Sequence, residues 1–108
     1  MLQIKNKAQL NQLLQGDTPV LLDFYADWCG PCQSLLPIVE SLADKHKDDF
    51  VIAKINVDDS GDIAQQFNVR SIPALFFVED QTIKESLVGL QTKDFLDNKI
   101  QSYIKKVA

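Results

Sequence analysis

The stretch Trp28-Cys29-Gly30-Pro31-Cys32 contains both cysteines of the 108-residue chain. An apolar run from Val20 to Tyr25, interrupted only by Asp23, precedes it and predicts a buried strand. Apolar residues at helical spacing follow it as far as Lys45 and predict a helix. The two thiols are therefore expected on a strand-to-helix turn, with Cys29 at the start of the helix.

The expected position of Cys29 gives its sulfur a distinct chemistry. The amino end of a helix presents unpaired N–H groups and the positive end of the helix dipole, and both favour an anion. A thiolate should therefore form there more readily than in free cysteine, and the thiolate is the nucleophilic form. The cysteine pair is the first candidate for a reactive site.

The composition is typical of one globular domain, expected to span residues 1–108. Hydrophobic residues make up 45% of the chain and charged residues 24%. The net charge of −4 and the lack of a basic stripe argue against nucleic-acid binding. No segment resembles a signal peptide or is apolar over the roughly 20 residues that span a bilayer, so we expect no membrane partner and a cytoplasmic location. A cycling disulfide fits that compartment better than a permanent one.

Hydrophobic periodicity predicts an α/β fold. Strands are expected at residues 2–4, 20–25, 50–57, 74–79 and 83–88, and helices after Asn6, from residue 29 or 30 to 45, at 62–67 and after Thr92. The last helix should bury Phe95, Leu96, Ile100, Tyr103, Ile104 and Val107. Strand–helix alternation implies parallel pairing, and a final hairpin adds antiparallel strands. The result should be a central mixed sheet of about five strands with helices on both faces.

With these residues in place, the chain resembles the thioredoxin family over nearly its whole length. The resemblance rests on residues 23–32, which read Asp-Phe-Tyr-Ala-Asp-Trp-Cys-Gly-Pro-Cys, on Lys54, on Ile72-Pro73 and on Gly89. It implies the thioredoxin fold and a cis proline after Ile72. It also implies dithiol–disulfide exchange with protein substrates.

The resemblance implies separate roles for the two cysteines. Cys29, expected to have the more exposed sulfur, would attack a substrate disulfide and form a mixed disulfide. Cys32, one helical turn inward, would then displace the reduced substrate. Zinc would need about four ligands, and His46 is the only histidine, so no metal is expected. An inert structural disulfide is the other alternative, but closing so short a loop would add little to the stability of the fold.

Asp23 is a carboxylate inside an otherwise apolar run, so it must be paired, neutral or functional. Burial would raise its pKa, which suits a proton acceptor for Cys32 during the second exchange step. Lys54 also interrupts a buried strand and is the natural partner of Asp23. A buried Asp–Lys pair with a purely structural role is the alternative.

Substrate binding is expected at residues around the cysteines, namely Trp28, Gly30, Pro31, Ile72, Pro73 and Gly89. In the family, the cis proline faces the cysteines, and the backbone of the preceding residue pairs with an extended substrate segment. Gly89 would let a substrate backbone approach closely, or would only break a strand. For Pro73 the alternative is a trans proline that starts a strand, and for Trp28 it is packing against the sheet edge.

The resemblance implies a small monomeric carrier that reduces disulfides in cytoplasmic proteins. No bound cofactor is expected, because the cysteine pair holds the two electrons, which would come from NADPH through a flavoprotein thioredoxin reductase. A disulfide oxidase or isomerase and a non-catalytic binding subunit remain open, although Gly30-Pro31 favours the reducing activity. Gln33 and Ala74 depart from common family residues and leave the reduction potential and substrate preference open.

Overall fold

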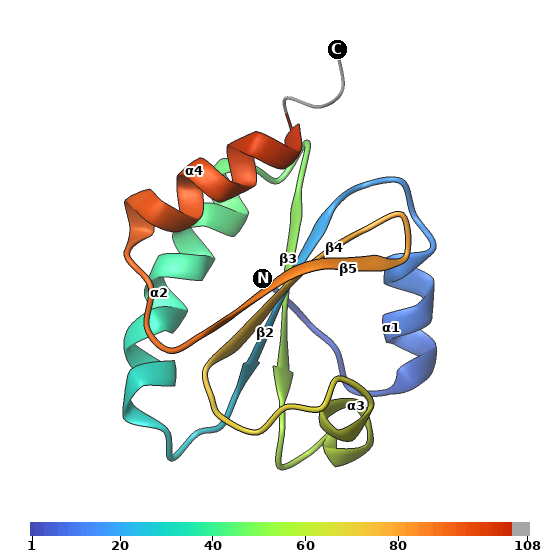
Figure 1. Cartoon of the computed structure of the whole chain (residues 1–108), viewed down its shortest axis with the longest axis vertical. Coiled ribbons are helices and arrows are strands. Elements are labelled where there is room, and N and C mark those ends of the chain that lie inside the picture. Colours follow the sequence, from blue (N-terminus) through green and yellow to red (C-terminus); the bar gives the residue numbers. More distant parts are fainter. Residues whose placement is uncertain (105–108) are drawn as a thin grey trace.

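The computed structural model describes residues 1–104 and shows five strands and four helices in that range (Figure 1). In chain order they are β1 (Leu2–Gln3), α1 (Lys7–Leu14), β2 (Val20–Tyr25), α2 (Gly30–Lys45), β3 (Val51–Asn56), α3 (Gly61–Gln66), β4 (Ala74–Glu79), β5 (Thr82–Val88) and α4 (Lys93–Ile104). Every expected element is present, and the bounds given from sequence differ by no more than one residue. Val107, expected in the core, lies outside the described residues.

The strands form one mixed sheet in the order β1-β3-β2-β4-β5. Strands β1, β3 and β2 run parallel, whereas β4 is antiparallel to β2 and β5 is antiparallel to β4. Helices α2 and α4 cover one face of the sheet, and α1 and α3 cover the other (Figure 1). The expected mixed sheet of five strands with helices on both faces is confirmed.

Strand β2 lies at the centre of the sheet, and all six of its residues are buried. Side chains along a strand alternate between the two faces of the sheet. Leu21 packs with the buried residues of α2 and α4, whereas Leu22 and Phe24 pack in the second core, with α1 and α3. Asp23 follows Leu21 by two residues, so it projects from the face that α2 covers.

Helix α2 begins just after the turn that follows β2. Cys29 is its N-cap residue, with an extended backbone, and the Cys29 sulfur accepts a hydrogen bond from the N–H of Cys32. Pro31 lies in the first turn, where a missing N–H removes no helical hydrogen bond. The turn and the helix start therefore hold both cysteines at the amino end of α2. The helix buries Cys32, Leu35, Val39 and Leu42.

Phe95 is 41% exposed, so its assignment to the core was wrong. The buried residues of α4 are Leu96, Ile100 and Tyr103. Phe95 is offset from Leu96 by about 100° around the helix axis, and this takes its ring away from the sheet. The ammonium group of Lys99 lies 5.6 Å from the centroid of that ring.

The β4–β5 hairpin forms without a glycine. Asp80 and Gln81 connect the strands, and both have left-handed φ values, of 54° and 62°. Positive φ at both central residues is the pattern of the type I′ turn, which matches the twist of paired strands. Aspartate tolerates the left-handed region, so the pairing of β4 with β5 imposes an unfavoured conformation only on Gln81.

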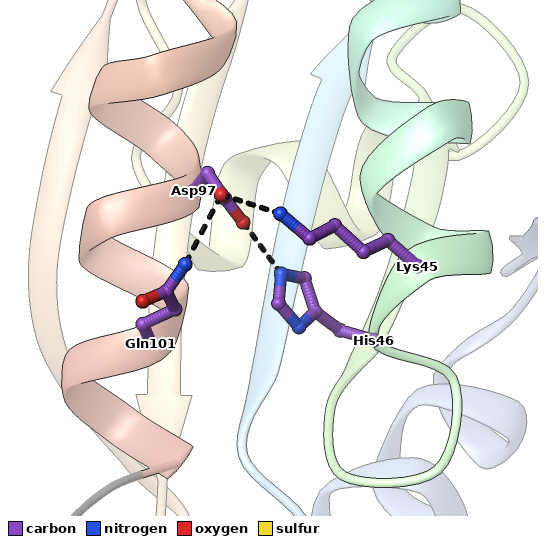
Figure 2. Close-up of polar contacts among 4 residues, drawn as sticks. All are labelled: Lys45, His46, Asp97 and Gln101. Atoms are coloured by element: carbon purple, nitrogen blue, oxygen red, sulfur yellow. Dashed lines mark hydrogen bonds and ion pairs between the residues drawn. The ribbon is translucent and has the colours of Figure 1, made fainter.

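A polar cluster joins the carboxyl end of α2 to α4 (Figure 2). Asp97 Oδ2 accepts hydrogen bonds from Lys45 Nζ at 2.8 Å and from Gln101 Nε2 at 3.1 Å. Asp97 Oδ1 lies 2.6 Å from Nε2 of His46. The hydrogen bonds from Lys45 and His46 lower the pKa of Asp97 to about 2. The cluster therefore fixes α4 to the end of α2 that lies away from the cysteines.

Asp97→Asn should lower the free energy of unfolding by about 1–2 kcal/mol at neutral pH, because it removes the charge that faces two basic groups. The folded pKa of about 2 lies below the ordinary value of 3.8. The stabilisation should therefore be complete above about pH 4 and disappear as the pH falls through the folded pKa. Denaturant unfolding at several pH values measures the difference. The control Asp94→Asn removes an acidic side chain from the first turn of the same helix and should cost less than about 0.5 kcal/mol.

Candidate active site

Cys29 and Cys32 form a disulfide at the amino end of α2, with their Cα atoms 5.2 Å apart. Cys29 is 5% exposed and Cys32 is completely buried. The first sulfur is therefore the more accessible of the two, as the sequence predicted. Tyr25 and Ala26, at the end of β2, pack beside the pair. The structure shows the oxidised form of the cysteine pair.

The sulfur of Cys29 lies between two backbone groups. The N–H of Cys32 donates to Cys29 Sγ at 3.2 Å, and the carbonyl oxygen of Ile72 lies 3.9 Å from the same sulfur. A free N–H at the amino end of a helix stabilises negative charge. Once the disulfide is reduced, this geometry favours a thiolate on Cys29.

The Ile72–Pro73 peptide bond is cis, which confirms the expectation from sequence. The carbonyl oxygen of Pro73 accepts a hydrogen bond from the N–H of Gly89 at 2.8 Å. Gly89 has a φ of +93°, which other residues rarely adopt, and no atom lies within 4 Å of the position that its Cβ would occupy. Gly89 therefore leaves open space beside the backbone of Pro73.

Trp28 forms an exposed side of the site. It is 72% exposed, and its Nε1–H donates to Oδ2 of Asp58 at 2.9 Å. Gly30 and Pro31 are also exposed. A groove of about 190 Å³ borders Trp28, and its other lining residues are Val57, Ala64, Val69, Arg70 and Ile72. The nearly buried sulfur is thus surrounded by a largely apolar surface.

Asn56 supports this surface, and the sequence analysis missed it. Its Oδ1 accepts hydrogen bonds from the N–H groups of Asp58 at 2.9 Å and Asp59 at 3.3 Å. These bonds hold the loop that presents Asp58 to Trp28. The available signal was an asparagine two residues before an aspartate at a strand end, a pattern typical of turns.

Asp23 is completely buried, and neither of its carboxylate oxygens has a hydrogen-bond partner within residues 1–104. Burial disfavours the charged form and raises the pKa of Asp23 to about 7, although the positive charge of Lys54 acts in the opposite direction. A carboxyl group with this pKa gains and loses its proton near neutral pH. The raised pKa expected from sequence is thus present in the structure.

Lys54 acts on Asp23 without touching it. The two residues are register partners on β3 and β2. Within the described part of the chain, however, neither a hydrogen bond nor an ion pair joins their side chains. Lys54 Nζ instead lies over the ring of Tyr25, 5.6 Å from its centroid. Lys54 therefore acts on Asp23 through its charge at a distance. The alternative of a directly bonded Asp–Lys pair was wrong.

Within residues 1–104, no group of three or more His, Cys, Asp or Glu side chains is placed to hold a metal ion. Over the same range, no helix combines the length and the apolar character needed to cross a membrane.

A family model described as Thioredoxin matches residues 1–102. The chain belongs to the thioredoxin family. It is 38% identical over 98 residues to a thioredoxin of Alicyclobacillus acidocaldarius subsp. acidocaldarius, covering 91% of this chain and 93% of that one. A chloroplastic M-type thioredoxin of Spinacia oleracea is 37% identical over 92 residues, covering 85% of this chain and 51% of that protein. Among solved structures, a mutant thioredoxin from Halobacterium salinarum NRC-1 matches with a TM-score of 0.89 and 42% identity, over 95% of this chain and 89% of that chain.

Membership in the thioredoxin family identifies the chemistry of the cysteine pair. Cys29 and Cys32 are the redox pair of a dithiol–disulfide oxidoreductase, and the chain is a protein-disulfide reductase. The thioredoxin fold expected from the sequence is confirmed. Two electrons and two protons convert the observed disulfide to the dithiol that reduces a substrate.

The raised pKa of Asp23 should make the stability of the chain fall as pH rises. Its pKa increases from 3.8 to about 7 on folding, so between these values the folded state retains a proton that the unfolded state has released. The free energy of unfolding should therefore decrease from about pH 4 to about pH 7 and then level off.

Asp23→Asn should remove most of this slope and exceed the wild type in stability above pH 7, by on the order of 3 kcal/mol. Denaturant unfolding across this pH range measures both effects. The control Asp94→Asn, on an exposed side chain, should keep the wild-type slope. If Asp23→Asn kept the wild-type slope, the pH dependence would not come from Asp23, and its raised pKa would be contradicted.

Proposed function

We propose that the chain, as one domain of residues 1–108, reduces protein disulfides in two exchange steps. First, the Cys29 thiolate attacks one sulfur of the substrate disulfide. The substrate S–S bond breaks, a bond to Cys29 forms, and the other substrate sulfur leaves as a thiolate. Second, the Cys32 thiolate attacks Cys29 Sγ, and the remaining substrate sulfur leaves as a thiolate. The cysteine pair is oxidised, and the substrate gains two electrons.

The assignment of Cys29 as nucleophile rests on two properties of its position. Its sulfur accepts an N–H at the amino end of α2 and is the less buried of the two. The first property favours the thiolate, and the second gives a substrate access to it. Cys32 is completely buried, so a substrate cannot reach its sulfur directly, and this suits the resolving role.

We propose Asp23 as the proton acceptor for Cys32 in the second step. Asp23 projects from the sheet face that α2 covers, and its carboxylate oxygens have no hydrogen-bond partner within residues 1–104. A pKa of about 7 suits a carboxylate that takes a thiol proton near neutral pH, directly or through a water molecule. Lys54 would tune this step, since its positive charge lowers the pKa of Asp23.

The substrate would bind over the surface formed by Trp28, Gly30, Pro31, Ile72, Pro73 and Gly89. An extended segment would pair with the backbone at Ile72, whose carbonyl oxygen is 3.9 Å from the Cys29 sulfur. The open space at Gly89 would admit the substrate backbone. Because backbone pairing does not depend on side chains, many disulfide-containing proteins should be accepted.

The oxidised pair needs an electron donor, for which we propose NADPH acting through a flavoprotein thioredoxin reductase. The cysteine pair itself holds the two electrons, so no bound cofactor is required. We propose that the protein acts as a monomer in the cytoplasm, with thioredoxin reductase and disulfide-containing proteins as partners. Its net charge of −4 disfavours nucleic acid and anionic membrane surfaces.

Cys32→Ser should trap substrates, because it blocks the second exchange step while leaving the first intact. Mixed disulfides through Cys29 should accumulate when the reduced variant is mixed with disulfide-containing proteins. Non-reducing electrophoresis and mass spectrometry of the linked peptides would detect them, and a dithiol reductant should release them.

The matched control is Cys29→Ser, which should capture little. In parallel, the wild-type protein with NADPH and thioredoxin reductase should consume NADPH as substrate thiols are released. Equal capture by the two serine variants would contradict Cys29 as the nucleophile. Capture without NADPH consumption would contradict only the proposed electron donor.

Asp23→Asn should slow the decay of a preformed mixed disulfide by about 10- to 100-fold at neutral pH, the size of a modest general-base effect. In the wild type this rate should rise as the pH passes about 7, and the variant should lack that rise. Lys54→Met should move the rise to higher pH, because it removes the charge that lowers the pKa of Asp23. Rapid-quench measurements of the mixed disulfide give these rates. Wild-type decay in Asp23→Asn at every pH would remove the proposed role.

A further inference from the structure

The segment that precedes the cis proline lies between two grooves. The first is the groove beside Trp28 described above. The second, of about 300 Å³, includes Phe67, Phe76 and Val88 in its lining. Arg70 lines both grooves, and among the described lining residues it is the one charged side chain in either. A single guanidinium group therefore lies where two grooves meet, and one of these grooves borders Trp28, the neighbour of Cys29.

Arg70 has no acidic partner in the described part of the chain. Its side chain is exposed, and its Nε–H donates to Oδ1 of Asn68 at 3.4 Å. Within residues 1–104, no ion pair includes Arg70. A guanidinium group offers several donors in a planar fork that matches a carboxylate. This one is available for an external carboxylate, in a chain whose net charge of −4 would otherwise repel one.

The backbone around Arg70 is held in place. The N–H of Asn68 donates to the carbonyl oxygen of Gln65 at 3.0 Å, and that of Val69 donates to Ala64 at 2.9 Å. Asn68 has a φ of 55°, which turns the chain out of α3. Arg70 precedes Ile72 by two residues, a separation of at most about 7 Å along an extended chain. It therefore lies within range of substrate side chains a few residues from the cysteine that reacts with Cys29.

Carboxylates lie next to Trp28, outside the lining of the first groove. Asp58 accepts the hydrogen bond from Trp28, and the neighbouring Asp59 is also exposed. Trp28, which lines the groove, thus contacts the carboxylate of Asp58, and Arg70 lines the same groove. A substrate segment that lies along the groove would meet the Arg70 guanidinium within it and the Asp58 carboxylate beside Trp28.

We propose that Arg70 is a specificity-determining residue of this reductase. It selects disulfide substrates that have a carboxylate side chain within three residues of the reacting cysteine, on the side of the segment that lies over Arg70. Asp58 disfavours a carboxylate next to Trp28. This inference rests on the proposed binding of the substrate along Ile72, and it adds a side-chain preference to backbone pairing.

The test compares disulfide peptides that place Glu, Gln or Lys three residues before or after the reactive cysteine. On one side only, the wild-type protein should reduce the Glu peptide with about three-fold higher kcat/KM than the Gln peptide, the size expected for an exposed ion pair. Arg70→Gln should abolish this preference, and Arg70→Glu should reverse it in favour of Lys. High ionic strength should reduce the wild-type preference.

The matched control is Lys84→Gln, which removes an exposed positive charge from β5 outside both grooves. It should keep the wild-type preference, because only the net charge has changed. Equal kcat/KM for Glu and Gln peptides at both positions would overturn the proposal. An equal loss for every peptide in Arg70→Gln would also overturn it, since the residue would then only support the loop. A wild type that cleaves none of the peptides would instead contradict the reductase activity.

Discussion

A backbone N–H in the first turn of α2 donates to the sulfur of Cys29, and the chemistry of the site depends on this contact. The contact exists because β2, the central strand, ends just before the helix begins, so the turn between them delivers the cysteine to the N-cap position. A sulfur in that position can accept a negative charge that a free cysteine would hold less readily. The second sulfur, one turn further, is covered by the helix and the sheet and stays out of reach of a substrate.

Strand β2 also contains a residue whose burial lowers the stability of the fold. Asp23 lies at the middle of the sheet without a hydrogen-bond partner in the described residues, an arrangement that packing alone would not favour. Lys54 relieves the cost only partly, because its ammonium group lies over the ring of Tyr25 instead of meeting the carboxyl group. The proposed role of Asp23 as a proton acceptor would give this costly residue a functional reason, and stability and function would then oppose each other at one side chain.

Other contacts keep the two ends of α2 in place while leaving the surface near the cysteines open. At the carboxyl end, Asp97 links the helix to α4 through two basic groups (Figure 2). At the amino end, the carbonyl oxygen of Ile72, just before the cis bond, lies near the reactive sulfur, and Gly89 bonds to the backbone of Pro73. Exposed apolar area at Trp28 and the unpaired charge of Arg70 are therefore concentrated where a partner would bind.

The amino-acid sequence by itself determined the order of strands and helices, the mixed sheet and the position of Cys29, because these follow from short-range periodicity, turn chemistry and helix capping. It also indicated that Asp23 is buried with a raised pKa, since one carboxylate stands in an apolar strand. Only the tertiary structure decided that Lys54 does not touch that carboxylate, that Phe95 faces solvent and that Arg70 lines a groove with Trp28. Each of these depends on distances between segments far apart in the chain, which no local pattern specifies.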